Sequence, residues 1–170
     1  DQSSKEKIRK EGKEKMINEV RTIFKQYKGT LGHVRRDYVE RQIEAGNVIL
    51  EDGVVIIFGK YQKKTKLGNQ TAVAGDFILH QLANRNKGNG MAVQVCKRFI
   101  GNVAGTADVW VCTRADNEGP IKLNKRLGME VVGEIFWQSG KIKGLVFRRD
   151  GLYHSIVGEQ YVQRNQSVQV

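Results

Sequence analysis

The sequence predicts an α/β protein of a single domain, built around one mixed sheet. Apolar residues recur at helical spacing in three stretches, residues 12–27, 34–43 and 91–100. Short apolar runs bounded by glycine and polar residues alternate with these stretches, as buried strands do. The 170 residues contain no internal repeat and no linker, and this length supports one domain with its own core.

Seven segments are predicted as strands. Asp52-Gly53 is a typical hairpin turn, so it joins two antiparallel strands, and a second pair meets across Ser139-Gly140. The apolar runs around Ile78 and Val111 predict two further, buried strands. The predicted strands are residues 7–10, 47–50, 54–58, 77–82, 107–112, 129–137 and 142–149.

Glycine and proline mark the ends of the predicted helices. Gly46 ends the second helix, and Pro120 suits the first turn of a fourth helix, which ends at Leu127-Gly128. The polar stretch 60–69 is predicted to be a solvated loop or a strand end. We place the domain at residues 1–150 and interpret residues 151–170, which carry no strong pattern, as a loosely attached C-terminal tail.

The composition argues against several classes of protein. No apolar run approaches the roughly 20 residues that span a bilayer, and the first residues lack the apolar stretch of a signal peptide. Two cysteines, Cys96 and Cys112, cannot form a disulfide framework, so a cytoplasmic location is expected. The formal net charge of +11 indicates either a polyanionic partner or a solvated basic surface.

The segment from Arg85 to Gly90 joins a predicted strand to a predicted helix. A helix N-terminus leaves backbone N–H groups unpaired and carries partial positive charge, and both features favour phosphate. Gly88 and Gly90 let an anion approach the backbone without a Cβ, while Lys87 and Arg85 add charge. A Walker loop requires Gly-Lys-Ser/Thr and a dinucleotide fingerprint requires a third glycine, and the segment has neither.

Two motifs resemble those of the GCN5-related N-acetyltransferase (GNAT) superfamily. Arg85-Asn86-Lys87-Gly88-Asn89-Gly90 is similar to its pyrophosphate-binding signature, Gln/Arg-x-x-Gly-x-Gly/Ala. Residues 113–130 are similar to its strand, Asn, short helix and Leu-Gly-Phe-Glu ending, with Met129 in place of Phe. Ile8-Arg9-Lys10-Glu11, before a helix, resembles the family's first strand. The resemblance covers about residues 6–149 and implies one GNAT-like domain with a mixed, mostly antiparallel sheet flanked by helices.

The resemblance also implies an N-acetyltransferase that uses acetyl-CoA. Its strand 77–82 is expected to splay from strand 107–112, so that pantetheine pairs with the backbone of residues 80–82. Asn117 matches a position whose side chain contacts the cofactor, and an Asn there equally suits a helix cap. The residues expected to hold the cofactor are Gln81, Leu82, Arg85, Asn86, Lys87, Gly88, Asn89, Gly90 and Asn117.

Three side chains are candidates for catalysis. His80 and Asp76 are placed to remove the proton of the attacking amine. Asn124 stands where many family members carry the Tyr that protonates the leaving thiolate, and an amide can hydrogen-bond sulfur but donates no net proton. A non-catalytic CoA-binding module is therefore an alternative reading. No metal site is predicted.

The acceptor is expected to be an amine on a small molecule or a protein. Nucleic acid is an alternative partner, because some phage proteins that resemble this superfamily modify DNA bases. The basic residues that could hold phosphates are those of loop 60–66 with Arg35, Arg36, Lys141, Lys143, Arg148 and Arg149.

Overall fold

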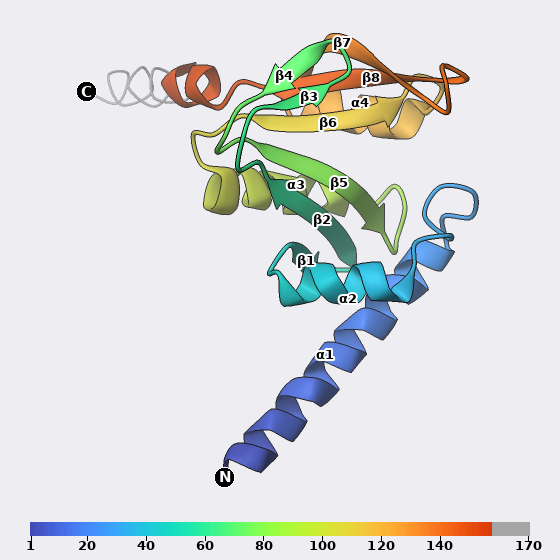
Figure 1. The fold of residues 1–170 in the computed structure, drawn as a ribbon, viewed down its shortest axis with the longest axis vertical. Helices are drawn as coiled ribbons and strands as arrows, with labels where there is room; N and C mark the ends of the chain where they lie inside the picture. Colours follow the sequence, from blue (N-terminus) through green and yellow to red (C-terminus); the bar gives the residue numbers. More distant parts are fainter. Residues whose placement is uncertain (158–170) are drawn as a thin grey trace. The chain divides into compact units, whose positions relative to one another are not determined.

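The structure, a computed structural model, describes residues 1–157 and combines helices with a six-stranded sheet (Figure 1). The strand order is β1-β2-β5-β6-β8-β7, and β3 pairs with β4 in a separate hairpin. Within the sheet β5 and β6 are parallel, whereas β1–β2, β6–β8 and β7–β8 are antiparallel. The predicted α/β class and mostly antiparallel sheet are therefore confirmed. The elements are α1 (Gln2–Lys25), α2 (Arg36–Glu44), β1 (Val48–Glu51), β2 (Val54–Lys60), β3 (Thr65–Leu67), β4 (Gln70–Ala72), β5 (Phe77–Asn84), α3 (Met91–Phe99), a π-helical turn (Ile100–Ala104), β6 (Val109–Arg114), α4 (Glu118–Arg126), β7 (Glu130–Trp137) and β8 (Ile142–Arg149).

The chain forms two compact units. The first contains Asp1–Phe58 and His80–Val95, and the second contains Gly59–Leu79 and the chain from Cys96 onward. In the first unit α1 and α2 bury their apolar stripes against β1, β2 and the end of β5. The buried core of that unit is Ile17, Val20, Ile23, Phe24, Val39, Val55, Ile57 and Ala83.

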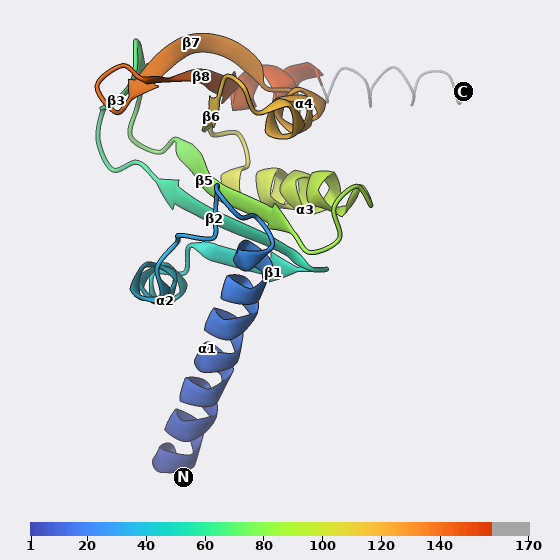
Figure 2. The same ribbon diagram turned by 90° about the vertical axis from the view of Figure 1, so that its right-hand side faces the viewer.

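The second unit is organised by a long hairpin, β7–β8, with β6 paired along β8 (Figure 2). A buried cluster of Leu67, Ala72, Ile78, Trp110 and Val146 joins the β3–β4 hairpin to this sheet. Asn69, in the β3–β4 turn, accepts the N–H of Glu134 at 2.9 Å and donates its own N–H to the Glu134 carbonyl at 3.2 Å. The hairpin thereby covers part of the edge strand β7, whose backbone would otherwise be unpaired.

The predicted opening strand at residues 7–10 is wrong. Residues 7–10 belong to α1, and the first strand among residues 1–157 is β1. The resemblance of Ile8-Arg9-Lys10-Glu11 to a family strand fails with it. Asp1 accepts the N–H of Ser3 and caps the helix, and the Lys, Glu and Arg that follow are good helix formers. Ile8 is 70% exposed, so no burial exists that could favour a strand there.

The other predicted helices and strands lie within a few residues of their predicted positions, whereas β4 and the π-helical turn were not predicted. The stretch 60–69, predicted as a loop or strand end, contains β3. Residues 151–157 are helical, and Gly151 donates its N–H to Asp108 while the His154 ring contacts the Gly128 carbonyl at 3.0 Å. The rest of the predicted tail, residues 158–170, lies outside the described residues. No helix within residues 1–157 is long and apolar enough to cross a membrane.

Candidate functional site

The predicted anion-binding segment, residues 85–90, is an exposed loop between β5 and α3, here termed the glycine loop. Gly88 and Gly90 have φ of +83° and +79°, a conformation that side chains with a Cβ rarely adopt. A Cβ built on either glycine would meet nothing within 4 Å. The backbone of the loop is therefore open to an approaching ligand.

Some backbone N–H groups of the glycine loop donate hydrogen bonds within the protein, and others have no acceptor within residues 1–157. Asn86 donates to the Asn84 side chain at 3.1 Å, and Asn89 donates to the Asn86 carbonyl at 3.3 Å. The N–H groups of Lys87, Gly88 and Gly90 have no hydrogen-bond partner within residues 1–157. Three free donors at the positive end of a nine-residue helix form an anion-binding arrangement.

Asn84, the last residue of β5, stabilises the conformation of this loop through side-chain hydrogen bonds. Its side chain is 6% exposed, and its Oδ1 accepts the Asn86 N–H in an Asx-turn. Its Nδ2 donates to Asn89 Oδ1 at 2.8 Å, and the same Asn89 oxygen accepts the Met91 N–H at 3.0 Å. One buried amide thus connects the strand end, the loop and the start of α3.

Tyr27, two residues beyond the end of α1, fixes Asn84 in turn. Its hydroxyl donates to the Asn84 carbonyl at 2.7 Å and accepts the Asn84 N–H at 2.9 Å. The phenol therefore satisfies both backbone groups of Asn84. The Lys87 ammonium lies 4.1 Å from the centre of the Tyr27 ring, a cation–π distance.

Arg85 is predicted to bind the cofactor, and both of its polar groups already have partners. Its guanidinium pairs with Glu19 at 2.9 Å, and its N–H donates to the Gly53 carbonyl at 2.8 Å. The structure thus gives Arg85 a role in attaching the loop to α1 and to the β1–β2 turn. Its predicted contact with a ligand stays a prediction.

The end of β5 carries three further predicted residues, of which Gln81 and Leu82 are half-buried and His80 is exposed. Gln81 Oε1 accepts the Tyr38 hydroxyl of α2 at 2.8 Å. Burial raises the pKa of Tyr38, against a smaller lowering by the bond to Gln81. Although the His80 side chain reaches solvent, desolvation by the surrounding protein lowers the pKa of its imidazole. His80 is therefore neutral, as a base must be, to a lower pH than an unperturbed histidine.

Asp76 lies in the second unit, at the start of β5, and is 7% exposed. Its Oδ2 accepts the indole N–H of Trp110 and the backbone N–H of Val73, each at 2.9 Å. A buried carboxylate with two such bonds fits a structural role. Within residues 1–157 no contact supports Asp76 as a base, and its assignment to catalysis stays a prediction.

Asn117 and Asn124 belong to the helix α4 of the same unit. Asn117 is the N-cap residue, yet its side chain makes no capping hydrogen bond and has no partner within residues 1–157. Asn124 is 4% exposed and donates from Nδ2 to the Thr113 hydroxyl of β6 at 3.1 Å. The two amides therefore differ: the Asn117 side chain is free for a ligand, and Asn124 joins α4 to β6.

Comparison with known proteins identifies the fold. No protein-family model and no curated protein matches the chain. Among solved structures it is similar to a GNAT-family acetyltransferase from Bacillus cereus, with 15% identity, a TM-score of 0.59, and coverage of 79% of this chain and 89% of that one. The chain has the GNAT fold.

Two other structures with the GNAT fold extend this likeness. The ribosomal-protein-S18-alanine N-acetyltransferase from Escherichia coli has 13% identity and a TM-score of 0.56, over 78% of this chain and 85% of that one. NAA60 from Arabidopsis thaliana, solved in complex with acetyl-CoA, has 12% identity and a TM-score of 0.57, over 79% and 93%. The resemblance carried by the two sequence motifs is thus confirmed in the GNAT fold.

Sequence reasoning missed Tyr27, Asn84 and Tyr38. An Asn two residues before a loop N–H is a recognised Asx-turn pattern, so Asn84 carried a local signal. Tyr27 and Tyr38 carried none, because they contact residues 57 and 43 positions away. Only the tertiary structure brings these hydroxyls to β5.

Many of the basic residues predicted to hold nucleic acid already have acidic or carbonyl partners. Lys143 pairs with Glu134 at 2.9 Å, and Arg148 pairs with Asp108 at 2.6 Å. Arg149 donates to the Leu127 carbonyl, and burial lowers the pKa of its guanidinium. These pairs favour a solvated, locally neutralised surface for this part of the second unit. A nucleic-acid partner stays a prediction.

Proposed function

We propose that this protein is an acetyl-CoA-dependent N-acetyltransferase that acetylates an amine acceptor. The GNAT fold, shared with acetyltransferases, supports the reaction class. The observation that carries the proposal is the set of three free N–H groups, on Lys87, Gly88 and Gly90, at the start of α3. Backbone donors of this kind suit the diphosphate of coenzyme A.

The residues of the glycine loop fit a diphosphate group. The loop offers hydrogen-bond donors and the positive end of α3, and the Lys87 ammonium, over the Tyr27 ring, supplies a positive charge nearby. The residues of the first unit that would hold acetyl-CoA are the loop and the backbone of Gln81 and Leu82. Acetyl-CoA supplies an acetyl group activated as a thioester.

The protein must bind the acceptor with its amine in the neutral form and must provide a group that accepts the amine proton. A new C–N bond forms as the C–S bond breaks, the amine loses one proton, and the released thiolate gains one. His80 is the proposed base, because its lowered pKa keeps the imidazole neutral to a lower pH than an unperturbed histidine. Asn124 is bonded to Thr113 and cannot donate a net proton, so we assign the protonation of the thiolate to water.

A second candidate function, a CoA-binding module without turnover, is favoured by the bonding of Asn124. Asn124, at the position where the resemblance expects a tyrosine, is buried and donates a hydrogen bond from its side-chain amide to the Thr113 hydroxyl. Such a protein would bind acetyl-CoA and leave amines unchanged.

One experiment separates the two functions. The full chain is purified and examined by native mass spectrometry for bound CoA or acetyl-CoA, and thiol release is then followed with a panel of primary amines. We expect the bound nucleotide together with amine-dependent thiol release. Binding without release would establish the CoA-binding module, and the absence of binding would reject both functions.

A further inference from the structure

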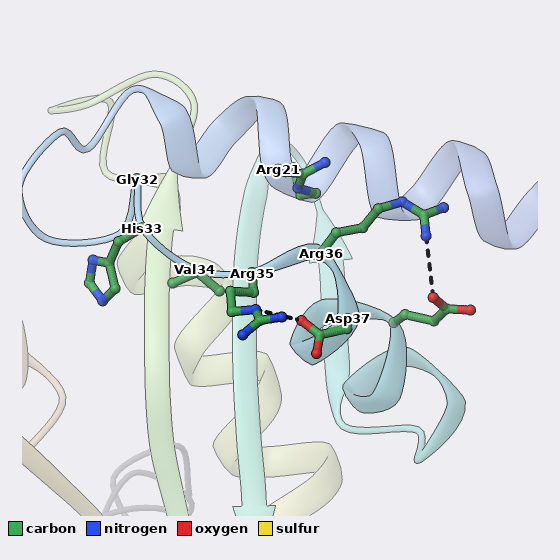
Figure 3. Close-up of a pocket in the computed structure, with 8 residues that line it drawn as sticks. Arg21, Gly32, His33, Val34, Arg35, Arg36 and Asp37 are labelled. Carbon is green, nitrogen blue, oxygen red and sulfur yellow. Dashed lines mark hydrogen bonds and ion pairs between the residues drawn. The ribbon is translucent and has the colours of Figure 1, made fainter.

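A pocket of about 510 Å³ lies in the first unit where the segment between α1 and α2 passes beside α1 (Figure 3). Arg21 of α1 reaches it from one side, and the connecting segment with the first turns of α2 forms the other. This volume falls within the range of pockets that bind small molecules. The lining residues are Arg21, Gly32, His33, Val34, Arg35, Arg36, Asp37 and Glu40.

The acidic residues around the pocket are already paired. Arg36 bonds Glu14 at 2.5 and 2.6 Å and Glu40 at 3.3 Å, and Arg35 and Arg41 pair with Asp37 at 3.2 and 3.3 Å. Lys13 pairs with Glu40 and with Glu44. This network joins four cations to four carboxylates, so its charges balance.

Arg21 stands outside that network. The side chain is half-buried and makes no ion pair or hydrogen bond within residues 1–157. His33 likewise has no partner in that range. The pocket therefore keeps one uncompensated positive charge, and the His33 imidazole also lines it. A guanidinium binds a carboxylate or a phosphate through two parallel hydrogen bonds, which a partly buried site strengthens.

One of the residues that line the pocket is adjacent in sequence to a residue that contacts β5. Asp37 lines it, and the next residue, Tyr38, donates its hydroxyl to Gln81 at 2.8 Å. Gln81 is one of the residues whose backbone is proposed to pair with the pantetheine arm. The helix α2 thus lines the pocket and also contacts the strand proposed to carry the acyl donor, and the pocket and Gln81 both lie in the first unit.

We propose that this pocket binds an anionic group of the acceptor, a carboxylate or a phosphate, so that the substrate is an amine that also carries negative charge. Arg21 provides the charged contact, and His33 and Arg35 also line the pocket. This inference rests on the proposed function, since it names the class of acceptor that the transferase uses.

The binding arm of the test uses the full chain and simple anions. Succinate and inorganic phosphate are titrated while NMR follows the Arg21 Nε–H and the backbone N–H of Val34, with succinamide as the neutral control. We expect saturable shifts with at least one anion and none with succinamide. Succinate alone would indicate a carboxylate, and phosphate alone a phosphoryl group. No saturable shift with either would overturn the proposal.

Variants decide whether Arg21 is responsible. Arg21→Gln should weaken anion binding by about tenfold or more, and Arg21→Lys, which keeps the charge without the fork, should weaken it less. Arg9→Gln, an exposed arginine on the same helix outside the pocket, should leave the affinity unchanged. Equal loss in the Arg9 and Arg21 variants would show general charge attraction and would reject the site.

The kinetic arm compares β-alanine with β-alaninamide as acceptors. We expect a lower KM for the carboxylate, and Arg21→Gln should raise that KM while the KM of the amide and both kcat values stay the same. Equal KM values in the presence of anion binding would show that the pocket does not serve the acceptor. Acetyl-CoA binding with no transfer to any amine would instead refute the proposed function, whatever the anions do.

Discussion

The glycine loop of the first unit and the two residues Asp76 and Asn124 of the second unit differ in the hydrogen bonding of their polar groups. In the loop, the N–H groups of Lys87, Gly88 and Gly90 have no partner within residues 1–157. In the second unit, Asp76 and Asn124 are buried and bonded to Trp110, Val73 and Thr113. Both regions contain residues that the sequence analysis predicted to be functional.

The difference shows what a resemblance in sequence carries over to a structure. Backbone donors are kept by the loop conformation, which two glycines with positive φ allow. A side chain at a position of the motif, such as Asn124, can instead be buried and join two elements of the fold. The glycine loop therefore supports cofactor binding more directly than the second unit supports catalysis.

The largest expected effect follows from filling the glycine loop. Gly88→Glu or Gly90→Glu places a Cβ and a negative charge beside the free N–H groups, so acetyl-CoA affinity should fall by about a hundredfold or more. Titration calorimetry measures this. Gly105→Glu is the matched control, since Gly105 also has positive φ and nothing within 4 Å of its Cβ. Undiminished affinity in both loop variants would place the cofactor elsewhere.

The next effect concerns His80 and pH. His80→Ala should lower kcat by about a hundredfold or more with acetyl-CoA affinity unchanged. Because the folded pKa of His80 lies below its ordinary 6.5, the acid limb of the kcat/KM profile should lie at a lower pH than that of an unperturbed histidine. A pH–rate profile checks the position of this limb, and a limb that persists in His80→Ala would exclude His80 as the base.

Two substitutions in the second unit test whether Asp76 and Asn124 stabilise the fold or take part in catalysis. Asp76→Ala removes the acceptor of a buried indole and should reduce the free energy of unfolding by about 3 kcal/mol, and Asn124→Ala by about 1–2 kcal/mol. Urea unfolding measures both. We expect kcat of Asn124→Ala to stay near that of the wild type. A loss of kcat without a loss of stability would make Asn124 a catalytic residue.

A smaller effect is expected at Tyr27. Tyr27→Phe leaves the carbonyl and N–H of Asn84 without their hydroxyl partner, so stability should fall by about 1–2 kcal/mol and acetyl-CoA affinity by a few fold. Tyr153→Phe is the control, because that side chain is 61% exposed. Unchanged affinity in a destabilised Tyr27→Phe protein would show that Tyr27 supports the fold without shaping the loop.

The smallest effect is expected at Arg85. Arg85→Ala removes a surface pair with Glu19, and such pairs contribute about 0–1 kcal/mol. Acetyl-CoA affinity should change by less than about threefold. A loss as large as that of the glycine variants would show that the guanidinium leaves Glu19 to bind the cofactor.

The sequence predicted the fold where local signals were strong. Gly88 and Gly90 fixed the loop, and Pro120 with Gly128 bounded α4 correctly. The opening strand failed because charged residues with high helix propensity extend α1 to residue 2. The Tyr27–Asn84 contact was beyond reach, because no local pattern pairs a hydroxyl with a backbone 57 residues away.

The free N–H groups are tested most directly by backbone amide NMR of the full chain during titration with acetyl-CoA. We predict that the N–H resonances of Lys87, Gly88 and Gly90 shift most, and that those of Asn86 and Asn89, which already have partners, shift less. Saturable binding that leaves Lys87, Gly88 and Gly90 unchanged would contradict the assignment of the glycine loop as the diphosphate site.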